Sequence, residues 1–156
     1  MIIKTYLKRV GHNMYLIPIP GKQGEQILKE FGKRVICKGN GGKIHCAVQK
    51  SKTHGFYIGA GKDARKKLKI QSEGELVLTI QEDNSKYQLE VPEELSEVLE
   101  TDPEASERFE ALTDGKKRSL IHYVGKAKQS MTRINRALKI AENLKFGFTD
   151  LKELMS

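Results

Sequence analysis

The chain has 156 residues, of which 38% are hydrophobic and 31% are charged, and this is enough apolar material for one large domain or two small ones. No apolar run approaches the roughly 20 residues that a membrane-spanning helix needs. The first residues also lack the apolar segment and cleavage site of a secretory signal peptide. We therefore expect a cytoplasmic protein.

The net charge of +8 is unevenly distributed along the chain. Residues 1–91 carry 17 Lys and Arg against 8 Asp and Glu, residues 92–114 carry 9 acids against one base, and residues 115–156 carry 10 bases against 3 acids. A basic surface attracts nucleic acids, anionic lipids and phosphorylated ligands. The acidic stretch can instead neutralise a basic neighbour within the fold, so both interpretations stay open.

The first ninety residues are predicted to be mainly β-structure with two short helices. Apolar alternation and short apolar runs bounded by turn residues indicate strands at Ile2–Val10, Met14–Ile19, Val35–Lys38, Ile44–Gln49, His54–Ile58, Glu75–Gln81 and Tyr87–Val91. Helical spacing is found over Lys22–Phe31 and Lys62–Leu68. Short strands with regularly spaced turns favour a small β-barrel, closed or split, because closure removes exposed strand edges.

A glycine-rich turn separates the two cysteines. Asn40-Gly41 predicts a two-residue hairpin turn, because both of its central residues need a positive φ, and this turn pairs Cys37 with Ile44. A Gly41-Gly42 turn would instead place Cys37 opposite Cys46. In both registers the two cysteines share one face of the hairpin. We expect two reduced thiols in an apolar core, and a redox pair is the alternative.

The sequence pattern changes at Pro92, which fits the first position of a helix. Apolar residues then recur at helical spacing, in segments that begin at Pro92, at Pro103 after an Asp102 N-cap, at Lys116, at Ser130 and after Thr149. These four or five helices with short connections predict a compact bundle. The predicted class is α+β, with a small β-barrel domain over residues 1–91 and an all-α bundle over residues 92–156.

Two groups of residues are candidate anion-binding sites. The glycines of Gly59-Ala60-Gly61 lead into a basic predicted helix, where free backbone N–H groups and cationic side chains can hold an anion. In the last long helix Arg133 and Arg136 are three residues apart, so their guanidinium groups can face together. The candidate residues are Gly59, Gly61, Lys62, Arg65, Lys128, Thr132, Arg133 and Arg136.

Each group also has a purely structural interpretation. The glycines can simply supply a flexible turn between a strand and a helix. The two arginines can pair with the acids of residues 92–114 and hold the bundle together. Both alternatives stay open at this point.

No arrangement typical of catalysis or of metal binding is apparent. The four histidines are scattered along the chain, at His12, His45, His54 and His122. His45 adjoins Cys46 and should therefore face the opposite side of its strand, which weakens a shared metal site. No Gly-x-Ser-x-Gly or His-Glu-x-x-His motif is present. We expect no catalytic residue, no metal and no cofactor.

The second half of the chain resembles a known family. Residues 92–147 are similar to the helical domain of the YdeI/OmpD-associated family, also called bacteriocin-protection-like, and the matching residues are Pro92, Asp102-Pro103, Leu112, Ala127-Lys128, Thr132-Arg133, Arg136 and Gly147. Residues 3–83 resemble a small bacterial β-barrel domain of unknown function that often precedes it and is similar to AbrB-like split barrels. The matching pieces are Ile17-Pro18, Val35, Asn40-Gly41, Ile58, the basic helix Lys62–Leu68 and Gly74-Glu75.

The resemblance implies a bacterial, cytosolic and non-catalytic protein with a loose link to envelope or bacteriocin stress. We therefore expect a binding or interaction protein whose partner is an anionic ligand or another protein. The first alternative is a nucleic-acid-binding protein that uses its basic β-domain. The second is an enzyme whose anion site combines Gly59–Arg65 with Arg133 and Arg136.

Overall fold

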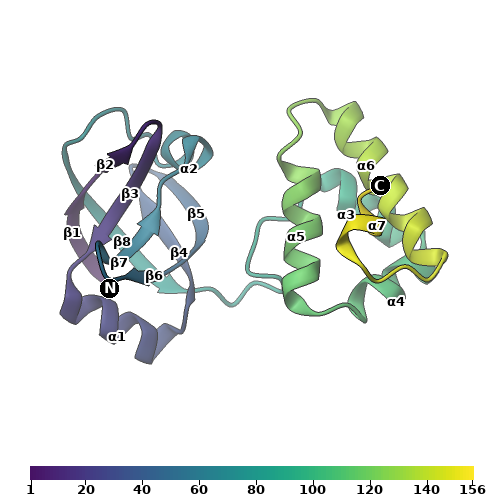
Figure 1. Cartoon of the computed structure of the whole chain (residues 1–156), viewed down its shortest axis with the longest axis horizontal. Helices are drawn as coiled ribbons and strands as arrows, with labels where there is room; N and C mark the ends of the chain where they lie inside the picture. The colour runs from purple at the N-terminus through teal and green to yellow at the C-terminus, as the bar shows by residue number, and fades with distance from the viewer. The chain divides into compact units, whose positions relative to one another are not determined.

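The computed structural model describes all 156 residues and divides into two compact units, Met1–Gln88 and Leu89–Ser156 (Figure 1). The first unit contains all eight strands and two helices. The second unit contains five helices and no strand. None of the seven helices has the length and hydropathy that crossing a bilayer requires.

The strands of the first unit form two antiparallel sheets. One sheet has the order β1 (Ile2–Tyr6), β8 (Glu75–Glu82), β4 (Arg34–Gly39) and β5 (Gly42–Ala47). The other has the order β2 (Lys8–Gly11), β3 (Met14–Ile19), β7 (Gly55–Gly59) and β6 (Gln49–Ser51). The strand pairing leaves two separate four-stranded sheets, so the predicted closed or split barrel is wrong.

Two buried corner residues explain why the strands form two sheets and not the predicted barrel. The expected strand Ile2–Val10 is interrupted at Leu7, and the expected strand Ile44–Gln49 is interrupted at Val48. Leu7 and Val48 are each only 3% exposed, so at both points the chain bends with a side chain buried in the core. There it passes from one sheet to the other, as strands do at the corners of packed sheets. Alternation within a strand does not reveal such a corner.

The core of the first unit lies between the inner faces of the two sheets. Its completely buried side chains are Ile3, Ile17, Ile27, Val35, Cys37, Ile58, Leu68 and Ile80. Helix α1 (Gly21–Phe31) contributes Ile27 to this core. Gly24 of α1 rests directly on the ring of Phe56, where a Cβ atom would overlap the ring. A glycine is therefore required for this close packing of helix on sheet.

The β4–β5 hairpin has the register that the Asn-Gly turn predicts. Asn40 and Gly41 have φ values of 51° and 82°, and Cys37 pairs with Ile44, so this alternative is confirmed. The hairpin tip packs against the end of α2 (Lys62–Lys67). The Asn40 side chain donates a hydrogen bond of 2.8 Å to the carbonyl of Leu68. A Cβ atom at Gly42 would overlap the carbonyl oxygen of Lys67.

The predicted strand over residues 87–91 is wrong. The chain leaves β8 at Glu82 and enters a turn in which Gln88 has a φ of 59° and its N–H donates to the carbonyl of Ser85 at 3.3 Å. A residue in this left-handed conformation cannot continue a ladder. The alternation of Tyr87, Leu89 and Val91 therefore does not produce a strand.

The second unit is built around one long helix. It comprises α3 (Glu93–Thr101), α4 (Pro103–Glu110), α5 (Asp114–Gly125), α6 (Ser130–Lys145) and α7 (Leu151–Leu154). Helix α6 contacts each of the other four. Asp102 caps α4 by accepting a hydrogen bond from the N–H of Ala105, with Pro103 at the first helical position, as predicted. Asp150, and not Thr149, precedes the final turn.

Candidate anion-binding site

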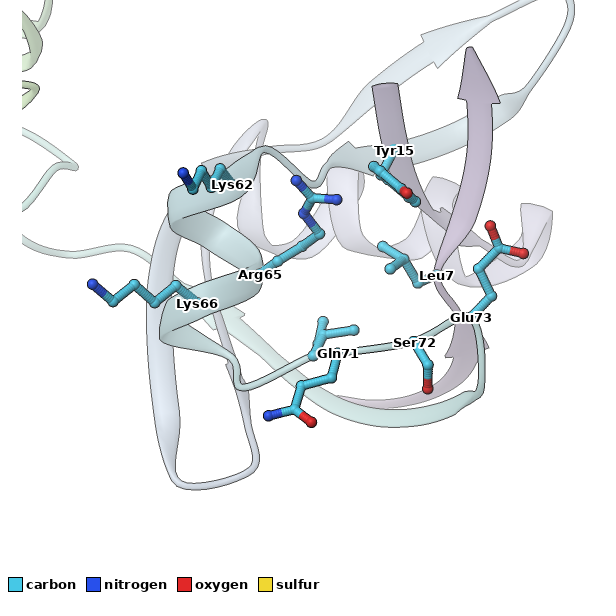
Figure 2. A pocket seen from close by; sticks show the side chains of 9 residues that line it. Leu7, Tyr15, Lys62, Arg65, Lys66, Gln71, Ser72 and Glu73 are labelled. Atoms are coloured by element: carbon cyan, nitrogen blue, oxygen red, sulfur yellow. The ribbon is translucent and has the colours of Figure 1, made fainter. Parts of the chain in front are cut away.

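A pocket of about 260 Å³ lies beside α2 in the first unit (Figure 2). Its lining residues are Leu7, Tyr15, Lys62, Arg65, Lys66, Ile70, Gln71, Ser72 and Glu73. Three of its cations come from α2, where residues three and four apart fall on one side of a helix. The segment that follows α2 supplies an amide, a hydroxyl and a carboxylate. The pocket is therefore polar and mostly cationic.

Arg65 is the cation of this pocket that packs on an aromatic ring. Its guanidinium carbon lies 4.1 Å from the ring centre of Tyr15, and Figure 2 shows the two side chains next to each other. Tyr15 belongs to β3, and its carbonyl accepts a hydrogen bond of 3.1 Å from Ala60, just before α2. Stacking on the ring orients the guanidinium and leaves its edge donors available to an anion.

The two lysines of the pocket lie at its rim. Both Lys62 and Lys66 are exposed, and their ammonium groups point away from the middle of the pocket in Figure 2. No carboxylate lies within ion-pairing distance of Lys62, Arg65 or Lys66. Glu73 on the opposite wall is the single acid of the lining. The excess positive charge of this wall is therefore not neutralised locally.

The predicted glycines take no part in the pocket lining. Gly59 is the last residue of β7, and Gly61 precedes α2 with a φ of −66°, a conformation that any residue adopts. The pocket instead includes Tyr15, Lys66 and Ser72, which are not among the candidate residues predicted from the sequence. Pairing of β3 with β7 brings Tyr15 near α2, and no local pattern indicates this pairing.

A second and larger hollow of about 720 Å³ runs along β1 and the start of β8. It is lined by residues 4–6 and 73–77. Its only cation is Lys4, and it contains two carboxylates, those of Glu73 and Glu75. This balance of charge does not favour an anion, so the pocket beside α2 is the better candidate.

The predicted arginine pair lies in the second unit, and its donors are already used. Arg133 Nε donates to Glu94 Oε2 at 2.8 Å, and Arg133 Nη1 donates to the carbonyls of Ala127 and Lys128 at 2.9 and 3.0 Å. These bonds join the end of α5 to α3 and α6. The backbone N–H of Glu94, the Ser130 hydroxyl and Arg133 hold the pKa of Glu94 below its usual value.

Arg136 is held in a similar way. Its Nη1 donates to the carbonyl of Tyr123 at 2.8 Å, and its guanidinium carbon lies 4.4 Å from the Tyr123 ring centre. Thr132 is half-buried, and Lys128 is exposed and contributes its carbonyl to Arg133. The two predicted groups of anion-binding residues thus belong to different units, and the arginines of the second unit stabilise the helices.

One hydrogen-bonded His–Asp pair of the first unit has the residue types of a catalytic pair. His45 Nδ1 lies 2.6 Å from Asp83 Oδ2, and the Asp83 side chain is completely buried. Burial raises the pKa of Asp83, but hydrogen bonds from Ser85 and His45 outweigh it and hold the pKa below the usual value. No local motif indicates this pair, because 38 residues separate its members and only the strand order β8-β4-β5 brings them together.

The two cysteines are protected thiols. Burial raises the pKa of both Cys37 and Cys46 to about 12, so both are neutral at physiological pH. Cys37 is completely buried, and neither cysteine forms a disulfide. No three of the His, Cys, Asp and Glu side chains come together in an arrangement that could bind a metal ion.

Residues 88–147 match the family model described as "Bacteriocin-protection, YdeI or OmpD-Associated". The match extends over the second unit from its beginning to the end of α6, and it confirms the resemblance inferred for the helical region. No curated protein and no solved structure shows a significant match to the chain.

Proposed function

We propose that the chain is a non-catalytic binding protein whose pocket beside α2 holds an anionic group of a small ligand. The observation that carries this proposal is the wall formed by Lys62, Arg65 and Lys66, which has no carboxylate partner within ion-pairing distance. Clustered like charges without a counter-charge repel one another, and a bound anion relieves that repulsion.

The side chains of the pocket favour a phosphate or carboxylate group attached to a partly apolar body. The oriented guanidinium of Arg65 can donate two parallel hydrogen bonds to either anion. Ser72 and Gln71 add neutral donors, while Leu7 and Ile70 supply apolar contact. The volume of about 260 Å³ lies just below the range that is usual for ligand pockets, so the pocket suits a small ligand.

The chemistry of the lining supports binding without catalysis. The polar groups of the lining are ammonium and guanidinium groups, an amide, a hydroxyl, the Tyr15 phenol and the Glu73 carboxylate. They can bind and orient a ligand, and none of these groups ordinarily titrates near neutral pH. Reproducible turnover of a phosphate or carboxylate ester that depends on Arg65 would contradict the non-catalytic part of the proposal.

The site can be tested directly by titrating the full chain with inorganic phosphate and with pyrophosphate while the backbone amide chemical shifts are monitored by NMR. We expect shifts confined to residues around the pocket, and at least tenfold weaker binding by Arg65→Gln. The matched control is Lys29→Gln, which removes an exposed cation of α1 in the same unit. Equal weakening by both variants, or no saturable binding, would overturn the proposal.

A second candidate, binding of a nucleic-acid backbone, is favoured by the hairpin that packs on α2. Lys38 and Lys43 are exposed and lie directly opposite each other on β4 and β5. Like charges in such a pair repel, and a bound phosphate chain relieves the repulsion. Under this alternative the full-length chain binds duplex DNA with an affinity that falls steeply with salt, and Lys38→Gln flattens the slope by about one unit. Binding that salt does not weaken would rule it out.

A further inference from the structure

The outward side of α6 carries large apolar side chains that the rest of the second unit leaves uncovered. The exposed fractions are 64% for Met131, 52% for Leu138 and 73% for Phe146. Asn135 and Glu142 are exposed between them on the same helix. Residues 131, 135, 138, 142 and 146 are separated by steps of three or four, so they form one stripe along the helix.

The end of this stripe is held in a fixed conformation. Gly147 has a φ of 95°, its N–H donates to the carbonyl of Leu144 at 3.0 Å, and the N–H of Phe148 donates to the carbonyl of Asn143 at 3.2 Å. This pair of bonds is the Schellman arrangement that ends a helix. It places the rings of Phe146 and Phe148 6.0 Å apart and nearly parallel, at 18°. The apolar surface is thus preorganised for a partner.

We propose that this α6 stripe (Met131, Asn135, Leu138, Glu142 and Phe146) is the interface of a homodimer in which α6 packs antiparallel on α6 of a second copy. A twofold axis between residues 138 and 139 places Met131 opposite Phe146 of the partner subunit. The same axis brings the two Leu138 side chains together at the centre. Each apolar side chain then meets another apolar one, as a self-complementary interface requires.

The polar members of the stripe select the antiparallel arrangement. The same axis places the amide of Asn135 opposite the carboxylate of Glu142 of the partner subunit, and an amide can donate to a carboxylate. Lys139, an exposed neighbour, comes within one helical turn of the partner's Glu142, which allows one ion pair on each side of the axis. A parallel pair would instead oppose two Glu142 carboxylates.

The charges of the stripe also favour a second copy of the chain, and not an anionic membrane, as its binding partner. Glu142 lies inside the stripe and would face the lipid headgroups, whereas membrane-surface helices are flanked by cations. Two further cations near the stripe already face carboxylates, since Lys145 pairs with Asp102 at 2.8 Å and Arg108 lies 3.7 Å from Glu104. The contact area along a helix of 16 residues is small, so we expect a dissociation constant on the order of 10–100 µM.

Sedimentation of the full chain over a range of concentrations tests the dimer. We expect the average mass to rise from monomer towards dimer above about 100 µM, and Leu138→Glu to remain monomeric with an unchanged melting temperature. The matched control is Val77→Glu, because Val77 of the first unit is 62% exposed. This control should leave the association unchanged.

Cysteine pairs test the direction of the two helices. Leu138→Cys should form a crosslinked dimer under mild oxidation, and Met131→Cys should crosslink efficiently only to a copy that carries Phe146→Cys. Efficient self-crosslinking of Met131→Cys would show parallel helices and overturn the proposal. A chain that stays monomeric at all concentrations, or binds anionic vesicles through the stripe instead, would also overturn it, as would a dimer unaffected by Leu138→Glu.

Discussion

In the first unit Lys62, Arg65 and Lys66 gather on one wall of a pocket without a carboxylate partner, whereas in the second unit the guanidinium of Arg133 is bonded to Glu94 and to two backbone carbonyls. Both sets of cations come from basic stretches of the chain, residues 1–91 and residues 115–156. Net charge alone therefore does not distinguish cations that hold a fold together from cations that are free to bind a ligand. The partners of each cation make that distinction.

The two units also differ in how tightly the backbone packs at the glycines within each unit. In the first unit a Cβ atom at Gly24, Gly39 or Gly42 would overlap a neighbouring group, because sheets and short helices pack there with little space. In the second unit the same atom at Gly115 would meet nothing within 4 Å, and at Gly125 it would come only as close as 3.3 Å to a side-chain atom of Pro92. Stability should therefore depend on glycines in the first unit and on side-chain networks in the second.

Gly42→Ala should have the greatest effect on stability. The added methyl group would overlap the Lys67 carbonyl, and this backbone atom cannot move without separating the hairpin from α2. We expect a loss of about 3 kcal/mol in the free energy of unfolding of the first unit, measured by urea denaturation. Gly115→Ala is the control and should be neutral or slightly stabilising. Equal stability of both variants would contradict the tight packing of the hairpin on α2.

Arg133→Gln should destabilise the second unit by about 2 kcal/mol, because two carbonyls lose a charged donor. Arg65→Gln is the matched variant, because it removes an arginine of the first unit in the same way. It loses only a ring contact, so its stability should fall by less than about 1 kcal/mol. Chemical denaturation of both variants measures the difference. Similar losses in the two variants would remove the distinction between structural and available cations.

Much of the secondary structure can be predicted from the sequence because its signals are local. The φ preference of Asn40-Gly41 determines the hairpin register, and Asp102-Pro103 determines the start of α4. The corners at Leu7 and Val48 cannot be predicted in this way, since they depend on which distant strands pair. For this reason the barrel prediction was wrong even though most strands were located.

The candidate site shows the same limit. Lys62 and Arg65 could be proposed because they lie together in a short basic helix. Tyr15, which orients Arg65, is about fifty residues away in the sequence and reaches the site only through strand pairing. Likewise, nothing in the sequence near Arg133 indicates that its donors are directed at backbone carbonyls.

Asp83→Asn tests the buried pair that joins β5 to the end of β8. Replacing the carboxylate weakens its bonds to His45 and Ser85, and we expect a loss of about 1 kcal/mol at neutral pH. Because the folded-state pKa of Asp83 lies below the usual value, this stabilisation is present above about pH 4. It disappears as the pH falls through the folded-state pKa. A difference between the two proteins that persists in acid would contradict the assignment.

Lys66→Gln should have the smallest effect, and its sign is opposite to that of the other variants. Lys62 and Lys66 are four residues apart on α2, so their repulsion destabilises the helix by about 0.2–0.5 kcal/mol. Removing one of them should raise the stability of the first unit at low salt, and the gain should vanish near 1 M salt, where charges are screened within about 3 Å. Saturating pyrophosphate should reverse the order and make the unaltered protein the more stable one, since a bound anion stabilises the folded state. A destabilising effect of Lys66→Gln without any ligand would mean that this lysine has a structural partner, as Arg133 does.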